Sequence, residues 1–328
     1  MSWQKAAANG IFPGVHFTGR WQARHIGPHF VMYTTNLGAA LSFQLDGASR
    51  AILHFLPTSQ LIPPQVAIRI DDGRFVHFDL AHLPIMLAVS PQPHQVTVVM
   101  SGNTDDDPVW NADAAAGFAF SGVTLPDGGT LTPIAPAGPK LTFIGDSITA
   151  GCWVMGHSPS KDYRAEAAYP AVAAEKLGAE ETRIAYSAAG ILQPGKGGVP
   201  AAKDFFGHID DRTPWAVNTG QDAVIVNLGT NDQAYPVEEF VSAYVRFAAQ
   251  LRGVYDYDTA ILLMVPFNQA LREPIRHIAH RGDRLQVVET AGWNITTSDG
   301  SHPDLEGHKT AAKHLVGILQ QVLASQKD

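Results

Sequence analysis

Side chains with the chemistry of an acyl-transfer site follow apolar segments in the second half of the chain. Gly145-Asp146-Ser147 follows LTFI, and Asp299-Gly300-Ser301-His302 lies near the C-terminus. A serine hydroxyl becomes a nucleophile when a histidine removes its proton, and a carboxylate fixes the tautomer of that histidine. These residue types predict Ser147 as nucleophile, His302 as general base and Asp299 as the orienting acid. The alternative for Ser147 is that it only caps a helix.

Acyl transfer also needs hydrogen-bond donors for the oxyanion of the tetrahedral intermediate. The backbone N–H of Ser147, the backbone N–H of Gly190 and the side-chain amide of Asn231 are the candidates. Gly190 follows the apolar segment RIAYS, and Asn231 follows AVIVNLGT. Glycine at 190 would let the backbone approach a substrate closely because it has no Cβ. Asp232 is expected to support its loop rather than to act on substrate.

The apolar segments that precede these groups predict the elements that position them. They are short and apolar throughout, as in strands buried on both faces of a parallel sheet, and helix-like segments alternate with them. The pattern predicts a three-layer α/β/α domain over 140–328 with its active site at the carboxyl ends of the strands. The expected strands are 141–145, 183–187, 223–229 and 260–266, and the expected helices are 169–178, 236–253 and about 305–324.

The first part of the chain, residues 1–135, has a different pattern. Short segments rich in β-branched and aromatic residues, several of them alternating in polarity, predict an all-β sandwich or jelly roll. Asp71-Asp72-Gly73 predicts a hairpin whose positive φ is supplied by glycine. The proline-containing segment 134–140 is expected to link the two domains. The expected strands are 30–35, 39–45, 51–56, 66–70, 74–80 and 94–100.

Composition and charge narrow the class of protein. The 328 residues are 45% hydrophobic and 16% charged, with a formal net charge of −8, which is typical of a globular protein and disfavours nucleic acid or an anionic membrane surface as a partner. No apolar run is long enough to span a bilayer. The start, MSWQKAAANGIFPG, has no apolar leader segment, so a cytoplasmic location is expected. A secreted form whose leader had been removed would look the same.

The cysteine and the remaining candidate histidines are expected to have structural rather than catalytic roles. Cys152 is the only cysteine, so no intrachain disulfide is possible, and we expect it to be a small buried residue. His308, the nearest alternative base, should lie inside the final helix. His277 and His280 lack further ligands nearby, so we expect no metal site, and acyl transfer on a serine needs no cofactor.

The ordered set Gly145-Asp146-Ser147, Gly190, 229–232 and 299–302 resembles the four blocks of the SGNH (GDSL-type) hydrolases. The resemblance covers about 140–328 and implies the roles given above for Ser147, Gly190, Asn231, Asp299 and His302. A β-sandwich ahead of such a domain, with FTGRW at 17–21, is similar to carbohydrate esterase family 2, whose members deacetylate sugars and xylan-type polysaccharides. Members of that family often lack the acidic triad residue, which this chain has as Asp299.

The resemblance implies a serine esterase acting on acetylated carbohydrate, such as acetylated xylo-oligosaccharides. A general short-chain carboxylesterase, a lipid esterase or a thioesterase is the alternative enzyme, and a non-catalytic carbohydrate-binding protein is the alternative of another class. Trp153, Trp215 and Phe267 are candidates to stack on a sugar ring, although core packing explains them equally well. The role of the sandwich and homo-oligomerisation stay open.

Overall fold

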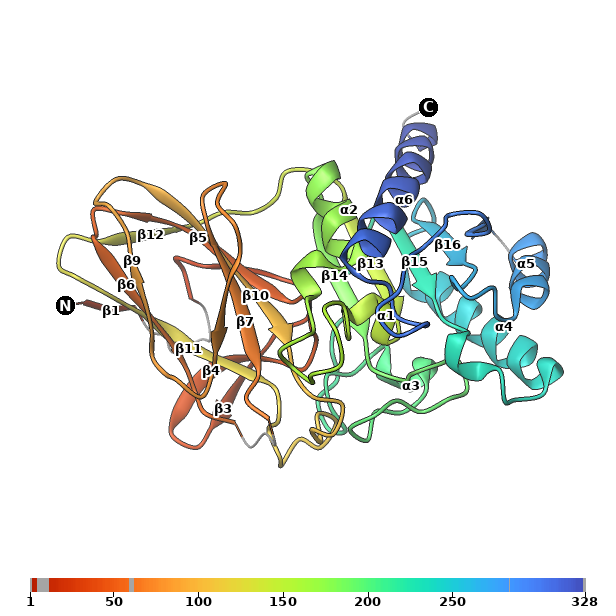
Figure 1. Cartoon of the computed structure of the whole chain (residues 1–328), viewed down its shortest axis with the longest axis horizontal. Coiled ribbons are helices and arrows are strands. Elements are labelled where there is room, and N and C mark those ends of the chain that lie inside the picture. Colours follow the sequence, from red (N-terminus) through yellow and green to blue (C-terminus); the bar gives the residue numbers. More distant parts are fainter. Residues whose placement is uncertain (1, 5–11, 59–61, 283, 327–328) are drawn as a thin grey trace.

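A computed structural model describes residues 2–4, 12–58, 62–282 and 284–326. Two antiparallel sheets form the first part of the chain, and a parallel sheet with helices forms the second (Figure 1). We call these parts the sandwich and the parallel-sheet half. None of the helices in the described residues is long and apolar enough to cross a membrane.

The sandwich consists of two six-stranded sheets that face each other. One has the order β3-β4-β11-β6-β9 with β1 beside β11, and the other has β12-β5-β10-β7-β8 with β2 beside β5. Strand β5 alternates between buried and half-buried residues, and its buried Leu41, Phe43 and Leu45 pack in one cluster with Leu53 and Phe120 of the opposite sheet. The strands are β1 (Ser2–Gln4), β2 (His16–Thr18), β3 (Gln22–Ile26), β4 (His29–Thr34), β5 (Ala40–Asp46), β6 (Arg50–Phe55), β7 (Gln65–Ile70), β8 (Val76–Asp79), β9 (Ile85–Ala88), β10 (His94–Gly102), β11 (Phe118–Leu125) and β12 (Thr130–Pro133).

The hairpin predicted at 71–73 is present, but its backbone differs from the expectation. Strands β7 and β8 pair antiparallel across it. The residue with positive φ is Asp71, at 52°, and not Gly73. Asp71 tolerates this conformation as short polar residues do, and its carboxylate accepts hydrogen bonds from the Gln95 N–H and the His94 ring.

The parallel-sheet half has the predicted three layers. Its sheet has the order β14-β13-β15-β16-β17, with every neighbouring pair parallel. Helices α2 and α6 cover one face through a cluster that includes Tyr169 and Leu315, and α4 and α5 cover the other with Phe240 and Ile275. Its elements are β13 (Lys140–Gly145), α1 (Ser147–Ala150), η1 (Ala165–Ala167), α2 (Tyr169–Leu177), β14 (Glu180–Ala185), α3 (Ala202–Phe205), β15 (Ala223–Asn227), η2 (Thr230–Asp232), α4 (Val237–Val254), β16 (Ala260–Met264), α5 (Arg272–Arg281), β17 (Leu285–Val288) and α6 (Leu305–Ser325).

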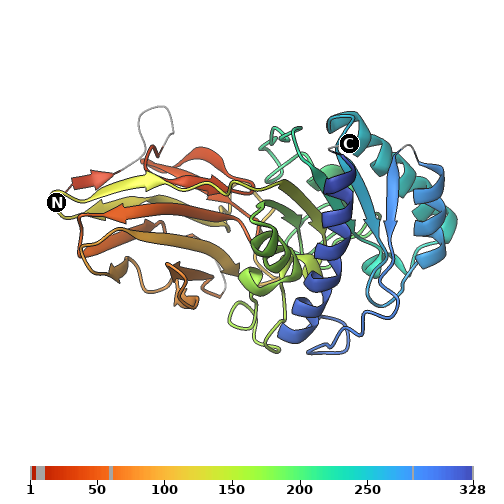
Figure 2. The same ribbon diagram turned by 90° about the horizontal axis from the view of Figure 1, so that it is seen from above.

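The strands and helices named from the sequence are confirmed in both parts. The structure adds elements that were not named. In the parallel-sheet half the main ones are the edge strand β17 and the helix α5, and in the sandwich they are β1, β2, β3, β9, β11 and β12. The domain boundaries at 135 and 140 stay a prediction. The sandwich strands end at Pro133 and the parallel sheet begins at Lys140, yet one hydrophobic cluster contains residues of both parts, Phe43 and Tyr163 among them. Figure 2 shows the sandwich strands running lengthwise toward the parallel-sheet half.

The arginine of the FTGRW segment joins the two parts. Arg20 is fully buried, and its guanidinium donates to the carbonyl oxygens of Phe205 and His208 at 3.0 and 2.7 Å. It also donates to Asn36 Oδ1 at 2.7 Å and to the Tyr186 hydroxyl at 2.6 Å. Arg20 therefore binds the carbonyl of Phe205, the last residue of α3, and that of His208 in the turn that follows the helix.

Replacing Arg20 by alanine is expected to lower the free energy of unfolding by about 3–5 kcal/mol, because it leaves buried acceptors unpaired and removes a buried side chain. Urea denaturation followed by tryptophan fluorescence measures this change. Arg50→Ala, at an exposed position of β6, is the matched control and should change the free energy by less than about 0.5 kcal/mol. Equal midpoints for the two variants would contradict the expectation.

Candidate active site

The sheet order brings three of the predicted site segments together. Ser147 follows β13, Gly190 lies in the loop after β14, and Asn231 lies in η2 after β15. Strand β13 lies between β14 and β15, where successive connections leave in opposite directions along the sheet. Such a switch point is where open parallel sheets place their ligands, at the carboxyl ends of the strands.

Ser147, His302 and Asp299 form a hydrogen-bonded chain. Ser147 Oγ lies 2.8 Å from His302 Nε2, and His302 Nδ1 lies 2.7 Å from Asp299 Oδ2. A carboxylate only accepts hydrogen bonds, so the proton belongs on Nδ1, which leaves Nε2 free to accept the Ser147 proton. The side chain of His302 is 17% exposed and the residue Ser147 is 6% exposed, so these hydrogen-bonded residues can be reached from the surface.

The alternative of Ser147 as a helix cap is wrong. The cap of α1 is Asp146, whose Oδ1 accepts the Ile148 N–H at 2.9 Å. Ser147 is the first residue of the helix, and its hydroxyl points to His302 instead.

Asp299 is fixed by its own loop. Its Oδ1 accepts the backbone N–H groups of Ser301 and His302 at 2.9 and 2.7 Å. Burial acts to raise the pKa of Asp299, but these two N–H groups and the His302 imidazole outweigh it, and the pKa lies below its ordinary value. The carboxylate therefore stays ionised in the form that holds His302.

The predicted oxyanion donors do not all have a free N–H. The N–H of Gly190 donates to the Gln193 carbonyl oxygen at 2.8 Å, and its part in an oxyanion hole stays a prediction. The N–H of Ser147, at the first position of α1, has no acceptor within the helix. Asn231 Nδ2 donates to the Ala189 carbonyl at 3.0 Å and makes a longer contact of 3.4 Å with Asp146 Oδ2.

Asp232 explains why position 190 is a glycine. Its carboxylate accepts the N–H groups of Ile191, Leu192 and Gln193 at 2.8–3.0 Å, as expected of a loop-supporting residue. A Cβ at Gly190 would lie 2.5 Å from this carboxylate. The glycine thus accommodates Asp232, and the backbone of this loop is fixed at the edge of the site.

Asp146, beside the nucleophile, is fully buried. Burial raises its pKa to about 7, against the lowering effect of the Ile148 and Thr149 N–H groups, and the neighbouring charge of Asp232 raises it further. Its ordinary pKa in an unfolded chain is about 3.9. At a pH between these two pKa values, the Asp146 carboxyl is protonated in the folded protein and ionised in the unfolded chain.

Raising the pH from about 4 to about 7 should therefore destabilise the wild type relative to Asp146→Asn, by up to about 1.4 kcal/mol per pH unit. The asparagine keeps an oxygen to cap α1 but has no proton to release. Urea denaturation of both proteins across this pH range measures the difference. Asp72→Asn, in an exposed turn, controls for the loss of one charge. If the free energies of unfolding of the wild type and Asp146→Asn differed by the same amount at every pH, the expectation would be contradicted.

His308, the alternative base, and Cys152 are both buried in the protein interior. His308 is fully buried in the first turn of α6, and its Nδ1 accepts the Tyr169 N–H at 3.1 Å. Burial, together with Arg183 and His302, lowers the pKa of His308 to about 3. Cys152 is also buried, and burial raises the pKa of its thiol well above the ordinary value, which disfavours the nucleophilic thiolate.

Of the three candidate aromatic residues, Trp153 is the one that contacts the loop carrying His302. Its carbonyl oxygen accepts a hydrogen bond from Ser298 Oγ at 2.5 Å. Trp215 lies against Arg20, with the guanidinium 5.5 Å from its ring, which accounts for this residue as packing beside the buried arginine. Phe267 packs against Tyr169 and Trp293. Sugar stacking stays a prediction for each of the three.

Among the residues that the structure describes, no three or more His, Cys, Asp or Glu side chains are grouped to hold a metal ion. His277 and His280 lie on α5. Sequence reasoning missed two polar residues that the structure connects to the site, Ser298 in the His302 loop and Tyr163 beside Trp153. A serine or a tyrosine in a loop gives no signal of such a role.

Comparisons with known proteins agree with this architecture. The model of the GDSL-like Lipase/Acylhydrolase family matches residues 143–312. The protein "Cellulase/esterase CelE" of Acetivibrio thermocellus is 25% identical over 234 residues, which are 62% of this chain and 28% of that protein. The chain thus corresponds to less than a third of the length of that curated relative.

Two solved structures share the fold over almost their whole length. A family two carbohydrate esterase from Clostridium thermocellum, in complex with cellohexaose, is 20% identical and has a TM-score of 0.77, with 95% of this chain and 99% of that chain covered. An acetyl xylan esterase from the rumen bacterium Butyrivibrio proteoclasticus is 19% identical and has a TM-score of 0.72, with 99% of both chains covered. These similarities confirm the combination of a jelly-roll sandwich with an SGNH-type half.

Proposed function

Because the chain belongs to the GDSL-like lipase/acylhydrolase family, we propose that it is a serine esterase that removes acetyl or other short acyl groups from carbohydrate. The observation that carries this proposal is the chain from Ser147 Oγ through His302 to Asp299, with contacts of 2.8 and 2.7 Å. It is an activated nucleophile with an oriented base.

In the first half of the reaction Ser147 Oγ attacks the ester carbonyl carbon while His302 Nε2 takes its proton. The negative charge that develops on the carbonyl oxygen is stabilised by the Ser147 N–H and by Asn231 Nδ2. The tetrahedral intermediate then collapses. The bond to the sugar oxygen breaks, and His302 gives its proton to this oxygen, so that the sugar leaves as an alcohol and the acyl group stays on Ser147.

In the second half a water molecule takes the place of the sugar alcohol. His302 Nε2 removes a proton from the water, and the oxygen attacks the acyl-enzyme carbonyl. Collapse of the second intermediate returns the proton to Ser147 Oγ and releases the carboxylic acid. Asp299 stabilises the imidazolium that forms in each half.

Three observations support carbohydrate as the alcohol part of the substrate. A relative that matches by sequence is named a cellulase/esterase, and a solved structure of the same fold is a complex with cellohexaose. Trp153 lies beside the His302 loop, where an aromatic ring could face a sugar bound over Ser147.

A screen of acetate release over acetylated xylo-oligosaccharides and acetylated monosaccharides tests the proposal. Beside it, p-nitrophenyl esters from acetate to octanoate and an acyl thioester give the acyl preference. Acetate release from an acetylated sugar, with kcat/KM above that for the longer p-nitrophenyl esters, supports a carbohydrate esterase.

The opposite preference would assign the same triad to a general short-chain esterase, a lipid esterase or a thioesterase. Labelling with a serine-reactive fluorophosphonate separates these enzymes from a non-catalytic carbohydrate-binding protein. The wild type should be labelled at Ser147. A wild type that neither reacts with the reagent nor hydrolyses any ester would refute the catalytic proposal.

A further inference from the structure

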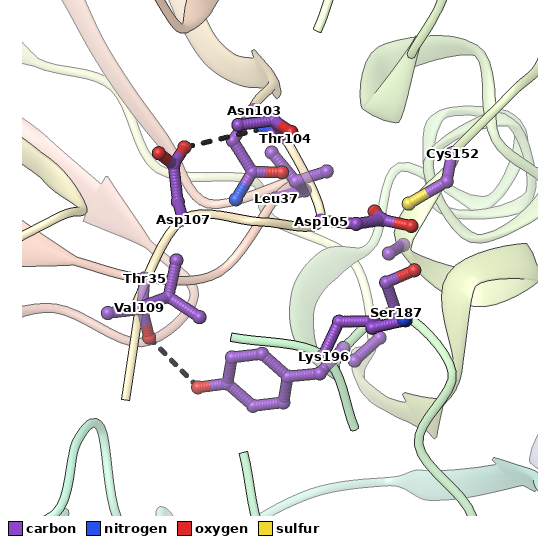
Figure 3. A pocket seen from close by; sticks show the side chains of 13 residues that line it. Thr35, Leu37, Asn103, Thr104, Asp105, Asp107, Val109, Cys152, Ser187 and Lys196 are labelled. Carbon is purple, nitrogen blue, oxygen red and sulfur yellow. Dashed lines mark hydrogen bonds between the residues drawn. The ribbon is translucent and has the colours of Figure 1, made fainter. Parts of the chain in front are cut away.

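The loop between β10 and β11 of the sandwich reaches into the parallel-sheet half. Its residue Asp105 accepts a hydrogen bond from the Tyr163 hydroxyl, with Asp105 Oδ1 at 2.6 Å. Figure 3 shows the Asp105 carboxylate turned toward Cys152. Both residues line a small cavity of about 20 Å³, to which both parts of the chain contribute. Tyr163 is fully buried and Asp105 is half-buried, so the donor side of this hydrogen bond lies inside the protein.

The sandwich also contacts other residues of the segment 151–163, which follows helix α1. Ser160 Oγ donates to the Pro63 carbonyl at 2.8 Å. A Cβ at Gly102 would lie 2.2 Å from the Ser160 carbonyl oxygen, so the end of β10 lies directly against this segment. Cys152 and Tyr163 belong to the same hydrophobic cluster as Phe43 and Met100 of the sandwich.

The segment 151–163 contacts the loop that carries His302. The Trp153 ring packs edge-on against Tyr163, with 4.8 Å between their centroids. The Trp153 carbonyl accepts Ser298 Oγ at 2.5 Å, and the Ser298 N–H donates to the His302 carbonyl at 2.9 Å. Trp153 also has a left-handed backbone, with φ of 59°, a conformation that its surroundings must hold in place.

We propose that Asp105 is a positioning residue of the active site, through which the sandwich sets the place of His302. The contacts run from Asp105 to Tyr163, Trp153 and Ser298, and then to the backbone of His302. The inference rests on the serine-esterase function proposed above. It gives the sandwich a part in the reaction even with a substrate too small to touch it, because a small misplacement of a catalytic base is costly.

The hydrogen bond between Tyr163 and Asp105 can be removed by changing either residue. Asp105→Ala removes the acceptor and Tyr163→Phe removes the donor, while Asp105→Asn keeps an acceptor oxygen. Asp106→Ala, at the exposed neighbouring position, is the matched control. The readout is kcat on p-nitrophenyl acetate per active site titrated with fluorophosphonate, so that unfolded molecules do not count.

We expect kcat per titrated site to fall about 10- to 100-fold in Asp105→Ala and in Tyr163→Phe. The double variant should lose no more than either single one, since both break the same contact. Asp105→Asn should recover most of the loss, and Asp106→Ala should match the wild type. The KM for p-nitrophenyl acetate should stay within about threefold throughout, because misplacing His302 affects chemistry rather than the binding of a small ester.

Two results would overturn the inference. One is a kcat per titrated site in Asp105→Ala equal to that of Asp106→Ala, which would mean that Asp105 only stabilises the fold. The other, which decides the matter if Asp105→Ala does not fold, is a Tyr163→Phe enzyme with unchanged kcat. A wild type that fails to hydrolyse the ester would refute the proposed function instead, so the two failures are distinguishable.

Discussion

Replacing Ser147 by alanine is expected to lower kcat on p-nitrophenyl acetate by about a million-fold, the loss seen when the nucleophile of a serine triad is removed. The variant keeps the backbone N–H of residue 147 and the cap of α1 by Asp146, so its fold should be that of the wild type. The remaining rate should be the small acceleration that an oxyanion site gives to attack by water. The measurement is p-nitrophenol release, with circular dichroism to establish folding.

The matched control for this variant is Ser90→Ala, at an exposed position of the sandwich. It should hydrolyse the ester and react with a fluorophosphonate as the wild type does, whereas Ser147→Ala should do neither. Full activity of Ser147→Ala would mean that another residue is the nucleophile, and the mechanism would have to be abandoned.

Replacing Asp299 by asparagine is expected to lower kcat by about 10⁴-fold. In the wild type, Asp299 Oδ1 accepts hydrogen bonds from the N–H groups of Ser301 and His302, and the amide oxygen of the asparagine can accept the same two hydrogen bonds. The amide nitrogen would then face His302 Nδ1 and donate to it. The imidazole would carry its proton on Nε2, facing Ser147 Oγ, where it cannot accept a proton.

Asp304→Asn is the control for this change, because asparagine caps a helix about as well as aspartate does and Asp304 caps α6. Its kcat should stay close to that of the wild type. A loss below about tenfold in Asp299→Asn would show that His302 is held by some other acceptor and that the enzyme works as a Ser–His pair.

Sequence alone was enough to predict the strands and helices whose patterns are strong. Strand β15 is apolar throughout and α4 has a continuous apolar stripe, and both lie where they were expected. Helix α5 and strand β17 were missed for physical reasons. The helix has Pro274 in its first turn and is rich in charged residues and histidine, and the edge strand is only partly buried.

The contacts of Ser147 and Asp299 with His302 could be predicted from the sequence, because their residue types and their places in the chain restrict the chemistry. Backbone hydrogen bonds were harder to predict. Whether the Gly190 N–H is free depends on where the Gln193 carbonyl lies, which no residue type encodes. The hydrogen bonds of Arg20 and Asp105 are made with partners in the other half of the chain, Phe205 and Tyr163. Contacts between residues so far apart in sequence leave no local pattern.

The hydrophobic cluster that Cys152 and Tyr163 share with the sandwich also bears on modularity. A chimaera that joined residues 140–328 to a foreign sandwich would have to reproduce the packing around these two side chains and the acceptor that Asp105 supplies. Otherwise the grafted half would present an apolar surface with no matching partner. For protein engineering, and for gene recombination in nature, the transferable unit is therefore both halves together.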